Sequence, residues 1–152
     1  SFTEAAAGGA LPREWMSLAV NSSVSRSQNQ LHIHIDCLRA DVHDALARHA
    51  GAIGPRWAPF PVPLAGHAFS ALAVDGADLD AHNPFLLLAD GLPGARDDMG
   101  SYTLVVTGAA GGTGFVILAA RVDARGPVFG GEALQDHQSC PAALPPGPDR
   151  AK

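Results

Sequence analysis

Two apolar runs that lie close together in the second half of the chain constrain the fold most. They are "SYTLVVTG" at residues 101–108 and "TGFVILAARV" at residues 113–122. Both are rich in the β-branched and aromatic residues that favour strands. The glycine-rich stretch "AAGGTG" between them is typical of a hairpin turn. The sequence therefore predicts an antiparallel hairpin over residues 101–122.

Other segments predict further strands and helices around this hairpin. Strands are expected at "WMSLAVN" (15–21) and "HAFSALAV" (67–74), and an irregular connection at residues 54–66, which hold four prolines. The spacing of Val42, Leu46 and Ala50 predicts a helix within residues 39–54, capped by Asp41 and stopped by Gly51 or Gly54. A second helix is expected from Pro84, with Asn83 as its N-cap, and a short one in "GGEALQDHQ" (130–138). Hairpins mixed irregularly with helices favour an α+β fold.

Composition and charge narrow the class of protein. The chain has 152 residues, which predicts one domain over residues 1–140 followed by a disordered, proline-rich tail at 141–152. The formal net charge is −5 and the basic residues form no cluster, which argues against a nucleic-acid partner. Cys37 and Cys140 lie far apart and match no CxxC pattern, so two buried thiols are expected.

The stretch "QLHIHIDC" (30–37) carries the chemistry of interest. Its alternation of apolar and polar residues predicts a strand, paired antiparallel with residues 15–21 across the polar loop between them. A period of two places alternate side chains on opposite faces. The expected buried face holds Leu31, Ile33 and Ile35, and the expected open face holds His32, His34 and Asp36.

Three interpretations of the open face remain at this point. The face is an ordinary solvated surface, or it binds a metal, or one of its histidines acts as a nucleophile. A metal site needs a third firm ligand beside the two imidazoles and Asp36. The other histidines fall in no recognisable ligand spacing, and those at 43 and 49 are expected to be solvated on the helix. A nucleophilic imidazole instead needs neutral donors near it to hold phosphoryl oxygens. Asn21, Ser27, Gln28 and Asn29 lie in or beside the connecting loop and supply such donors.

At these residues the sequence resembles a known superfamily. Asn21, Gln28, His32 and His34 reproduce the pattern N-x6-Q-x3-H-x-H of the histidine-triad (HIT) nucleotidyl hydrolases and transferases. The longer stretch "SLAVNSSVSRSQNQLHIHIDCLRADV" is similar to one branch, the bacterial CDP-diacylglycerol pyrophosphatases. "RW" (56–57), "LAGH" (64–67), "MGSYTL" (99–104) and "LQDHQSC" (134–140) resemble the same branch.

The resemblance implies an activity and roles for these residues. The fold would be a HIT-like antiparallel sheet with flanking helices. His34 would attack the cytidine-side phosphorus of CDP-diacylglycerol and expel phosphatidate, and water would then release CMP from the cytidylyl-histidine. His32 would assist proton transfer, and Asn21, Gln28 and Asn29 would bind the phosphate or nucleotide. No metal or other cofactor is implied.

Two departures from the family pattern bear on these expectations. Asp36 stands where the superfamily has its third histidine, as in the pyrophosphatase branch, and its role is left open. Family members also carry an upstream segment with a hydrophobic anchor. The resemblance therefore implies that this chain starts inside the domain, that its protein is attached to the bacterial inner membrane, and that Cys37 or Cys140 pairs with an upstream cysteine. The alternatives are a transferase or hydrolase of another nucleotide conjugate, and a non-catalytic nucleotide-binding fragment.

Overall fold

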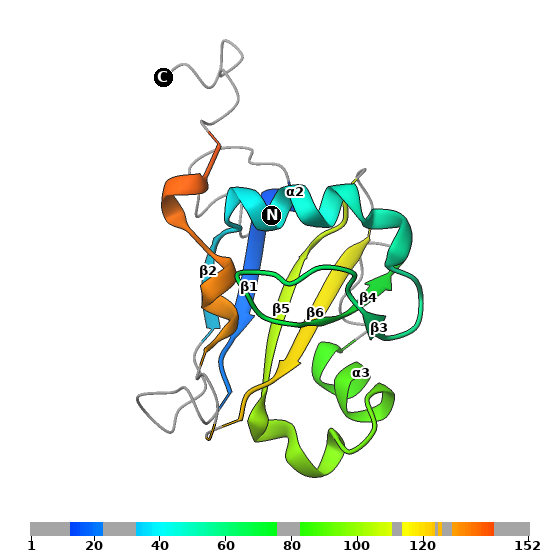
Figure 1. Cartoon of the computed structure of the whole chain (residues 1–152). Coiled ribbons are helices and arrows are strands. Elements are labelled where there is room, and N and C mark those ends of the chain that lie inside the picture. The colour runs from blue at the N-terminus through cyan, green and yellow to red at the C-terminus, as the bar shows by residue number, and fades with distance from the viewer. Residues whose placement is uncertain are drawn as a thin grey trace.

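A six-stranded antiparallel sheet is the frame of the described residues in this computed structural model (Figure 1). The structure describes residues 13–22, 33–75, 83–110, 114–123, 125 and 129–141. The strand order is β2-β1-β5-β6-β4-β3. The strands are β1 (Met16–Val20), β2 (Ile33–Cys37), β3 (Ala58–Pro59), β4 (Ser70–Val74), β5 (Tyr102–Gly108) and β6 (Phe115–Arg121). The predicted α+β class is confirmed.

The two strands of the predicted hairpin lie in the middle of the sheet. β5 and β6 pair from Tyr102 opposite Arg121 to Gly108 opposite Phe115. Their side chains are almost all buried, because each strand has a neighbour on both sides and is covered on both faces. The predicted pairing of the histidine strand is also confirmed, since β2 runs antiparallel to β1 at one edge of the sheet.

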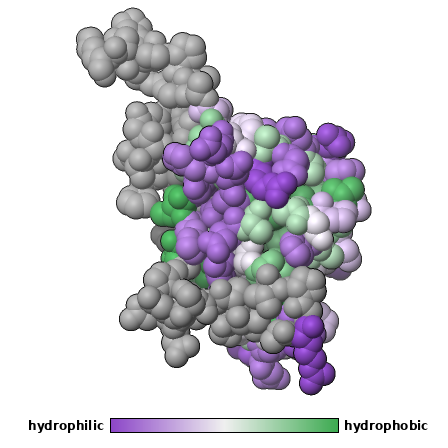
Figure 2. All heavy atoms as spheres, turned by 60° about the vertical axis from the view of Figure 1, so that its left-hand side comes forward, coloured by the Kyte–Doolittle hydropathy of each residue, from purple (hydrophilic) through white to green (hydrophobic). Residues whose placement is uncertain are grey.

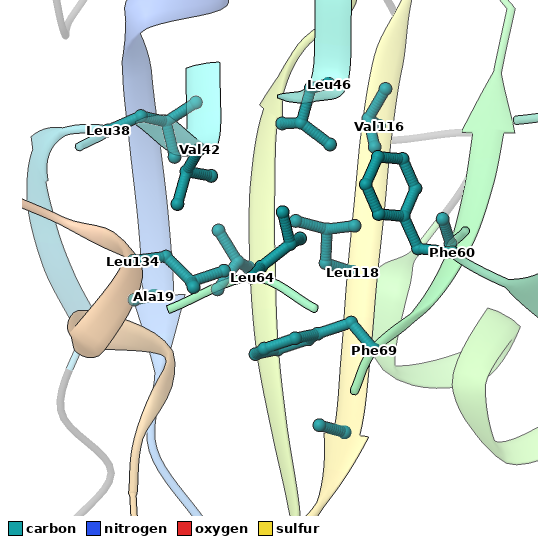
Figure 3. Packing of buried hydrophobic residues seen from close by; sticks show 13 residues of the cluster. Ala19, Leu38, Val42, Leu46, Phe60, Leu64, Phe69, Val116, Leu118 and Leu134 are labelled. Atoms are coloured by element: carbon teal, nitrogen blue, oxygen red, sulfur yellow. The ribbon is translucent and has the colours of Figure 1, made fainter. Parts of the chain in front are cut away.

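The helix that follows the histidine strand is α2 (Ala40–Arg48), which packs on one face of the sheet (Figure 3). Its Val42 and Leu46 are buried among residues of the strands and of the proline-rich connection. The predicted cap was wrong. Arg39 precedes the helix, and Asp41 lies inside the first turn with its carboxylate on the Arg39 guanidinium. A 3₁₀ turn, η2 (Ala50–Ala52), follows the helix and carries Gly51.

A second helix, α3 (Pro84–Gly91), covers part of the opposite face. Asn83 is its N-cap as predicted, and its side chain accepts hydrogen bonds from the amides of Phe85 and Leu86. Pro84 fits the first turn because its missing N–H would have no partner there. Further 3₁₀ turns are η1 (Arg13–Trp15) before β1 and η3 (Arg96–Ser101) before β5. Among the described residues, no helix is long and apolar enough to cross a membrane.

The chain returns to the histidine strand after β6. The predicted short helix is instead two 3₁₀ turns, η4 (Gly131–Leu134) and η5 (His137–Ser139), which lie on the β2 side of the sheet (Figure 1). Gln135 interrupts a continuous helix, because it pairs with Leu38 in a β-bridge, and Asp136 then caps a new turn. The expected proline-rich tail lies, apart from Pro141, outside the described residues.

The two cysteines form a disulfide with each other, Cys37 in β2 and Cys140 after η5. Both expectations for them, buried thiols and a partner upstream, were wrong. The sequence separation of 103 residues hid the pairing, because only the fold brings the end of η5 to the end of β2. The disulfide therefore joins the histidine strand to the segment that carries η4 and η5.

Candidate active site

The site lies at the outer edge of the sheet, where β2 has a strand neighbour on one side only within the described residues. His34 stands opposite Ala19 of β1, and Asp36 stands opposite Ser17. These side chains therefore share the face of the sheet that α2 covers, because residues directly opposite each other in a pair point the same way. His32, Gln28 and Asn29 lie outside the described residues.

The expected burial of this strand was wrong. Ile33 and Ile35 are 54% and 40% exposed, whereas the side chain of Asp36 is 33% exposed. The reason is the position of the covering elements. The segment with η4 and η5 packs on the polar face of β2, and α3 packs against the strands further along the sheet. Figure 2 brings this edge forward and shows hydrophilic residues over much of it, beside smaller hydrophobic areas.

The imidazole of His34 meets a carboxylate. Its Nε2 lies 3.4 Å from Oε2 of Glu132 in η4, and the two side chains are 41% and 52% exposed. The main-chain oxygen of His34 accepts a hydrogen bond of 3.0 Å from the side-chain amide of Gln135. A side chain 101 residues away along the sequence thus fixes the backbone of the histidine, while the ring itself stays partly open to solvent.

Two glycines bring Glu132 to this position. A Cβ on Gly131 would lie 2.6 Å from Cγ2 of Val105, and a Cβ on Gly130 would overlap the side-chain amide of Asn21. The amide of Gly131 donates a 2.7 Å hydrogen bond to Oγ1 of Thr103, which itself donates to the main-chain oxygen of Val20. The missing side chains therefore let η4 lie directly on β1 and β5. Glu132 is the first side chain after this close approach.

Gln135 holds the same segment to β1 and to the edge strand β2. Its Nε2 donates to the main-chain oxygen and to Oγ of Ser17 in β1, in addition to His34. Main-chain bonds run alongside, from Asp136 to the carbonyl of Cys37 and from Arg39 to the carbonyl of Leu134. The position of η4 is thus set by backbone pairing as well as by the disulfide.

Asp36 faces η5 rather than the tip of His34. Its Oδ1 accepts from the amide of Cys37 and lies 3.1 Å from Nδ1 of His137. Asp36, His137 and Cys140 also form the one group of described residues with the spacing of metal ligands. The Cys140 sulfur is bound in the disulfide, and a metal ligand would need to be a thiolate. The residues present do not fit a metal centre at this place.

Two further sequence motifs lie beside the site. Asn21, which is 7% exposed, follows β1 and lines a small pocket with Met99, Gly100 and Tyr102 of "MGSYTL" and with Leu88 of α3, so this pocket opens on the face of the sheet opposite to that of His34. His67 of "LAGH" stacks on Phe129, with ring centroids 3.7 Å apart, immediately before Gly130. Asn21, "LAGH" and "MGSYTL" come from three distant parts of the sequence, and all three lie near the two glycines that position Glu132.

The helix histidines have packing roles. His43 was expected to be solvated, but its ring stacks on Trp15 at 3.8 Å and its side chain is 17% exposed. Its Nε2 lies 3.8 Å from Oε2 of Glu14. His49 makes an edge-to-face contact with Phe60. Both residues belong to the packing of α2 rather than to the site at β2.

One ion pair fixes η3 to the sheet. A hydrogen bond from the Ser101 hydroxyl and another from the Arg121 guanidinium lower the pKa of Asp98 below its ordinary value. The same pair raises the pKa of Arg121. This interaction joins the turn that carries "MGSY" to the end of β6, and so supports the pocket beside Asn21.

Comparison with known proteins assigns the family. The family model described as CDP-diacylglycerol pyrophosphatase matches residues 1–143. The chain belongs to this family. A curated CDP-diacylglycerol pyrophosphatase from Yersinia pestis is 41% identical over 123 residues, which are 80% of this chain and 47% of that protein. The chain thus spans about half the length of the curated relative it matches.

In this member of the CDP-diacylglycerol pyrophosphatase family, the fold adds Glu132 and Gln135 to the residues singled out from the sequence. "LQDHQSC" was already seen as similar to the branch, yet nothing in its spacing connected Gln135 to His34. Glu132 stands just before that stretch. One feature of the sequence could have pointed to Glu132. Two adjacent glycines precede it, and glycines at such a place indicate that the backbone lies close to another element.

Proposed function

We propose that the protein hydrolyses the pyrophosphate of CDP-diacylglycerol, giving CMP and phosphatidate through a covalent nucleotidyl-histidine on His34. The observation that carries the proposal is the position of His34. Its backbone is held by Gln135, and its side chain, which is 41% exposed, lies on the polar side of an edge strand. Membership of the family supports the substrate. The N-x6-Q-x3-H-x-H pattern supports a HIT-like fold and a role for imidazole.

The chemistry follows from what an imidazole does as a nucleophile. The lone pair of Nε2 attacks the cytidine-side phosphorus, and the bond to the oxygen of phosphatidate breaks with its electron pair. Water then attacks the same phosphorus, the bond to Nε2 breaks, and CMP leaves. Splitting one difficult displacement into two easier steps is the usual gain of covalent catalysis. The scheme requires no metal.

The remaining predicted residues take supporting roles in this scheme. Asn21 lies against Gly130, the residue just before η4, which suits a donor to a phosphoryl oxygen on that side of β1. His32, Gln28 and Asn29 keep the roles that the resemblance implies, in proton transfer and in binding the phosphate or nucleotide. Asp36 acts through η5, because its carboxylate lies against His137. Since the substrate is a lipid, the protein works at a membrane surface.

Replacing the nucleophile tests the proposal. We expect His34→Ala to stop the release of CMP from CDP-diacylglycerol, while circular dichroism and thermal unfolding match the unchanged protein. His49→Ala is the matched control, because it removes a partly exposed histidine outside the site. A folded His34→Ala variant that keeps most of the activity contradicts the proposal. Adding an acceptor alcohol separates hydrolysis, in which water takes the nucleotide, from transfer to the alcohol.

A further inference from the structure

We propose that Glu132 is the general base of the second step, which takes the proton of the water that releases CMP from His34. The inference rests on the proposed function, because it requires the nucleotidyl-histidine. Neither the histidine pattern nor the polar loop before it includes this residue. The contact that assigns it is the one between Oε2 of Glu132 and Nε2 of His34, at 3.4 Å.

The two atoms in contact are the ones that the second step requires. Nε2 is the nitrogen that carries phosphorus in the proposed intermediate, so a carboxylate beside it lies next to the reacting centre. The Glu132 side chain is 52% exposed, and water therefore reaches it. A base that activates water needs both properties: nearness to the phosphorus and access to solvent.

The position of Glu132 is also built into the fold. Gly130 and Gly131 have no room for side chains against Asn21 and Val105. The amide of Gly131 is tied to the buried hydroxyl of Thr103. The backbone of η4 is therefore fixed, whereas the carboxylate beyond it turns about the side-chain bonds. The proposal requires the carboxylate to leave its place beside Nε2 when phosphorus binds there, and to reach the water that attacks on the side of the phosphorus opposite the bond to Nε2.

The step balances as follows. The oxygen of a water molecule forms a bond to phosphorus, and one of its protons passes to the Glu132 carboxylate. The bond between phosphorus and Nε2 breaks, and its electron pair returns to the imidazole ring. CMP leaves, and Glu132 later gives its proton to solvent. The first step needs no such base, because the attacking lone pair of Nε2 carries no proton and phosphatidate leaves as a stable anion.

A purely structural role for Glu132 predicts something different. An exposed contact between a carboxylate and an imidazole contributes little to stability, so losing it would change neither folding nor a single step of the reaction by much. Removing a general base slows its own step by a factor of about 10² to 10⁴. The two half-reactions can be measured separately, and therefore the two roles can be distinguished.

The test compares Glu132→Gln with the unchanged protein in a single turnover, using CDP-diacylglycerol labelled in the cytidylyl phosphate. We expect phosphatidate to appear in a burst at the normal rate. Label should then stay on the protein, and CMP should be released about 10²- to 10⁴-fold more slowly. Glu14→Gln is the matched control. It also removes a carboxylate beside an imidazole, that of His43, but away from β2, and it should release CMP normally.

Each other outcome overturns the inference. Normal release of CMP by Glu132→Gln, faster release, or an equal slowing of labelling and of release all show that Glu132 is not the base of the second step. Failure of the proposed function gives another result. If His34 is not the nucleophile, neither the unchanged protein nor Glu132→Gln carries label at any time, and His34→Ala still hydrolyses CDP-diacylglycerol. A normal thermal unfolding curve of Glu132→Gln shows that a slow release is not a loss of folding.

Discussion

The side-chain amide of Gln135 donates a hydrogen bond of 3.0 Å to the main-chain oxygen of His34, across 101 positions of the sequence. The same amide donates to Ser17, so one glutamine joins η4 and η5 to β1 and to the edge strand β2. The histidine strand is held in place from two sides, by β1 and by the segment at residues 129–141. Three predictions on stability follow from this arrangement, and one from the ion pair at η3.

Gln135→Ala should destabilise the protein and lower its activity. The change leaves the partly buried acceptors of Ser17 and His34 without this donor, at a cost of about 1–3 kcal/mol in the free energy of unfolding. Urea unfolding measures that cost. Gln138→Ala is the control, because Gln138 is exposed and lies three residues further along. Equal stabilities of the two variants would contradict the role given to Gln135.

The disulfide between Cys37 and Cys140 should stabilise the fold and hold η5 against β2. Removing it by the double change Cys37→Ala and Cys140→Ala should cost about 2–5 kcal/mol, as for other native disulfides. Thermal unfolding with and without a reducing agent measures the effect. The unchanged protein should lose stability on reduction, whereas the double variant should not respond. A response of both, or of neither, argues against a disulfide at this place.

Gly131→Ala should be costly because η4 lies so close to the sheet. The added Cβ would lie 2.6 Å from Val105 Cγ2 and 3.1 Å from the Leu104 carbonyl, and overpacking of this kind costs about 1–3 kcal/mol. Displacement of η4 would also move Glu132 from His34, so CMP release should fall as well. Gly51→Ala is the control, since nothing lies within 4 Å of its added Cβ. A neutral Gly131→Ala would show that η4 adapts without strain.

The ion pair between Asp98 and Arg121 should make stability depend on pH. Hydrogen bonds from Ser101 and Arg121 lower the pKa of Asp98 in the folded state. Its contribution is therefore complete above the ordinary pKa of aspartate, about 3.9, and is lost as the pH falls through the lower folded value. Asp98→Asn should have a lower Tm than the unchanged protein at pH 7, and this difference should shrink in acid. A difference that does not change with pH contradicts the assignment.

The sequence predicted those parts of the fold that depend on neighbouring residues. The β5–β6 hairpin, the pairing of β2 with β1 and the Asn83 cap follow from local patterns, and all three are confirmed. The burial of β2 was predicted wrongly, because it depends on which elements cover each face. A period of two says that Ile33 and His34 point to opposite faces, but it does not say which face the rest of the chain will cover.

The candidate site was predictable only in part for the same reason. His34 stands out because polar donors of the neighbouring loop converge with the histidine pair, and because the pattern is similar to that of a known superfamily. Glu132, Gln135 and the disulfide join it through contacts across about a hundred residues, which no spacing along the chain reveals. Asp41 shows the converse case. Aspartate often caps helices, but Asp41 lies within the first turn of α2 and pairs with Arg39.

The proposed covalent intermediate on His34 can be tested by locating it in the protein. The protein is mixed briefly with CDP-diacylglycerol, quenched in alkali, where phosphohistidine survives, and digested for mass spectrometry. We expect a cytidylyl group on His34, at a higher level in Glu132→Gln and absent from His34→Ala. Turnover without any modified peptide, or a cytidylyl group on another residue that persists in His34→Ala, would contradict it.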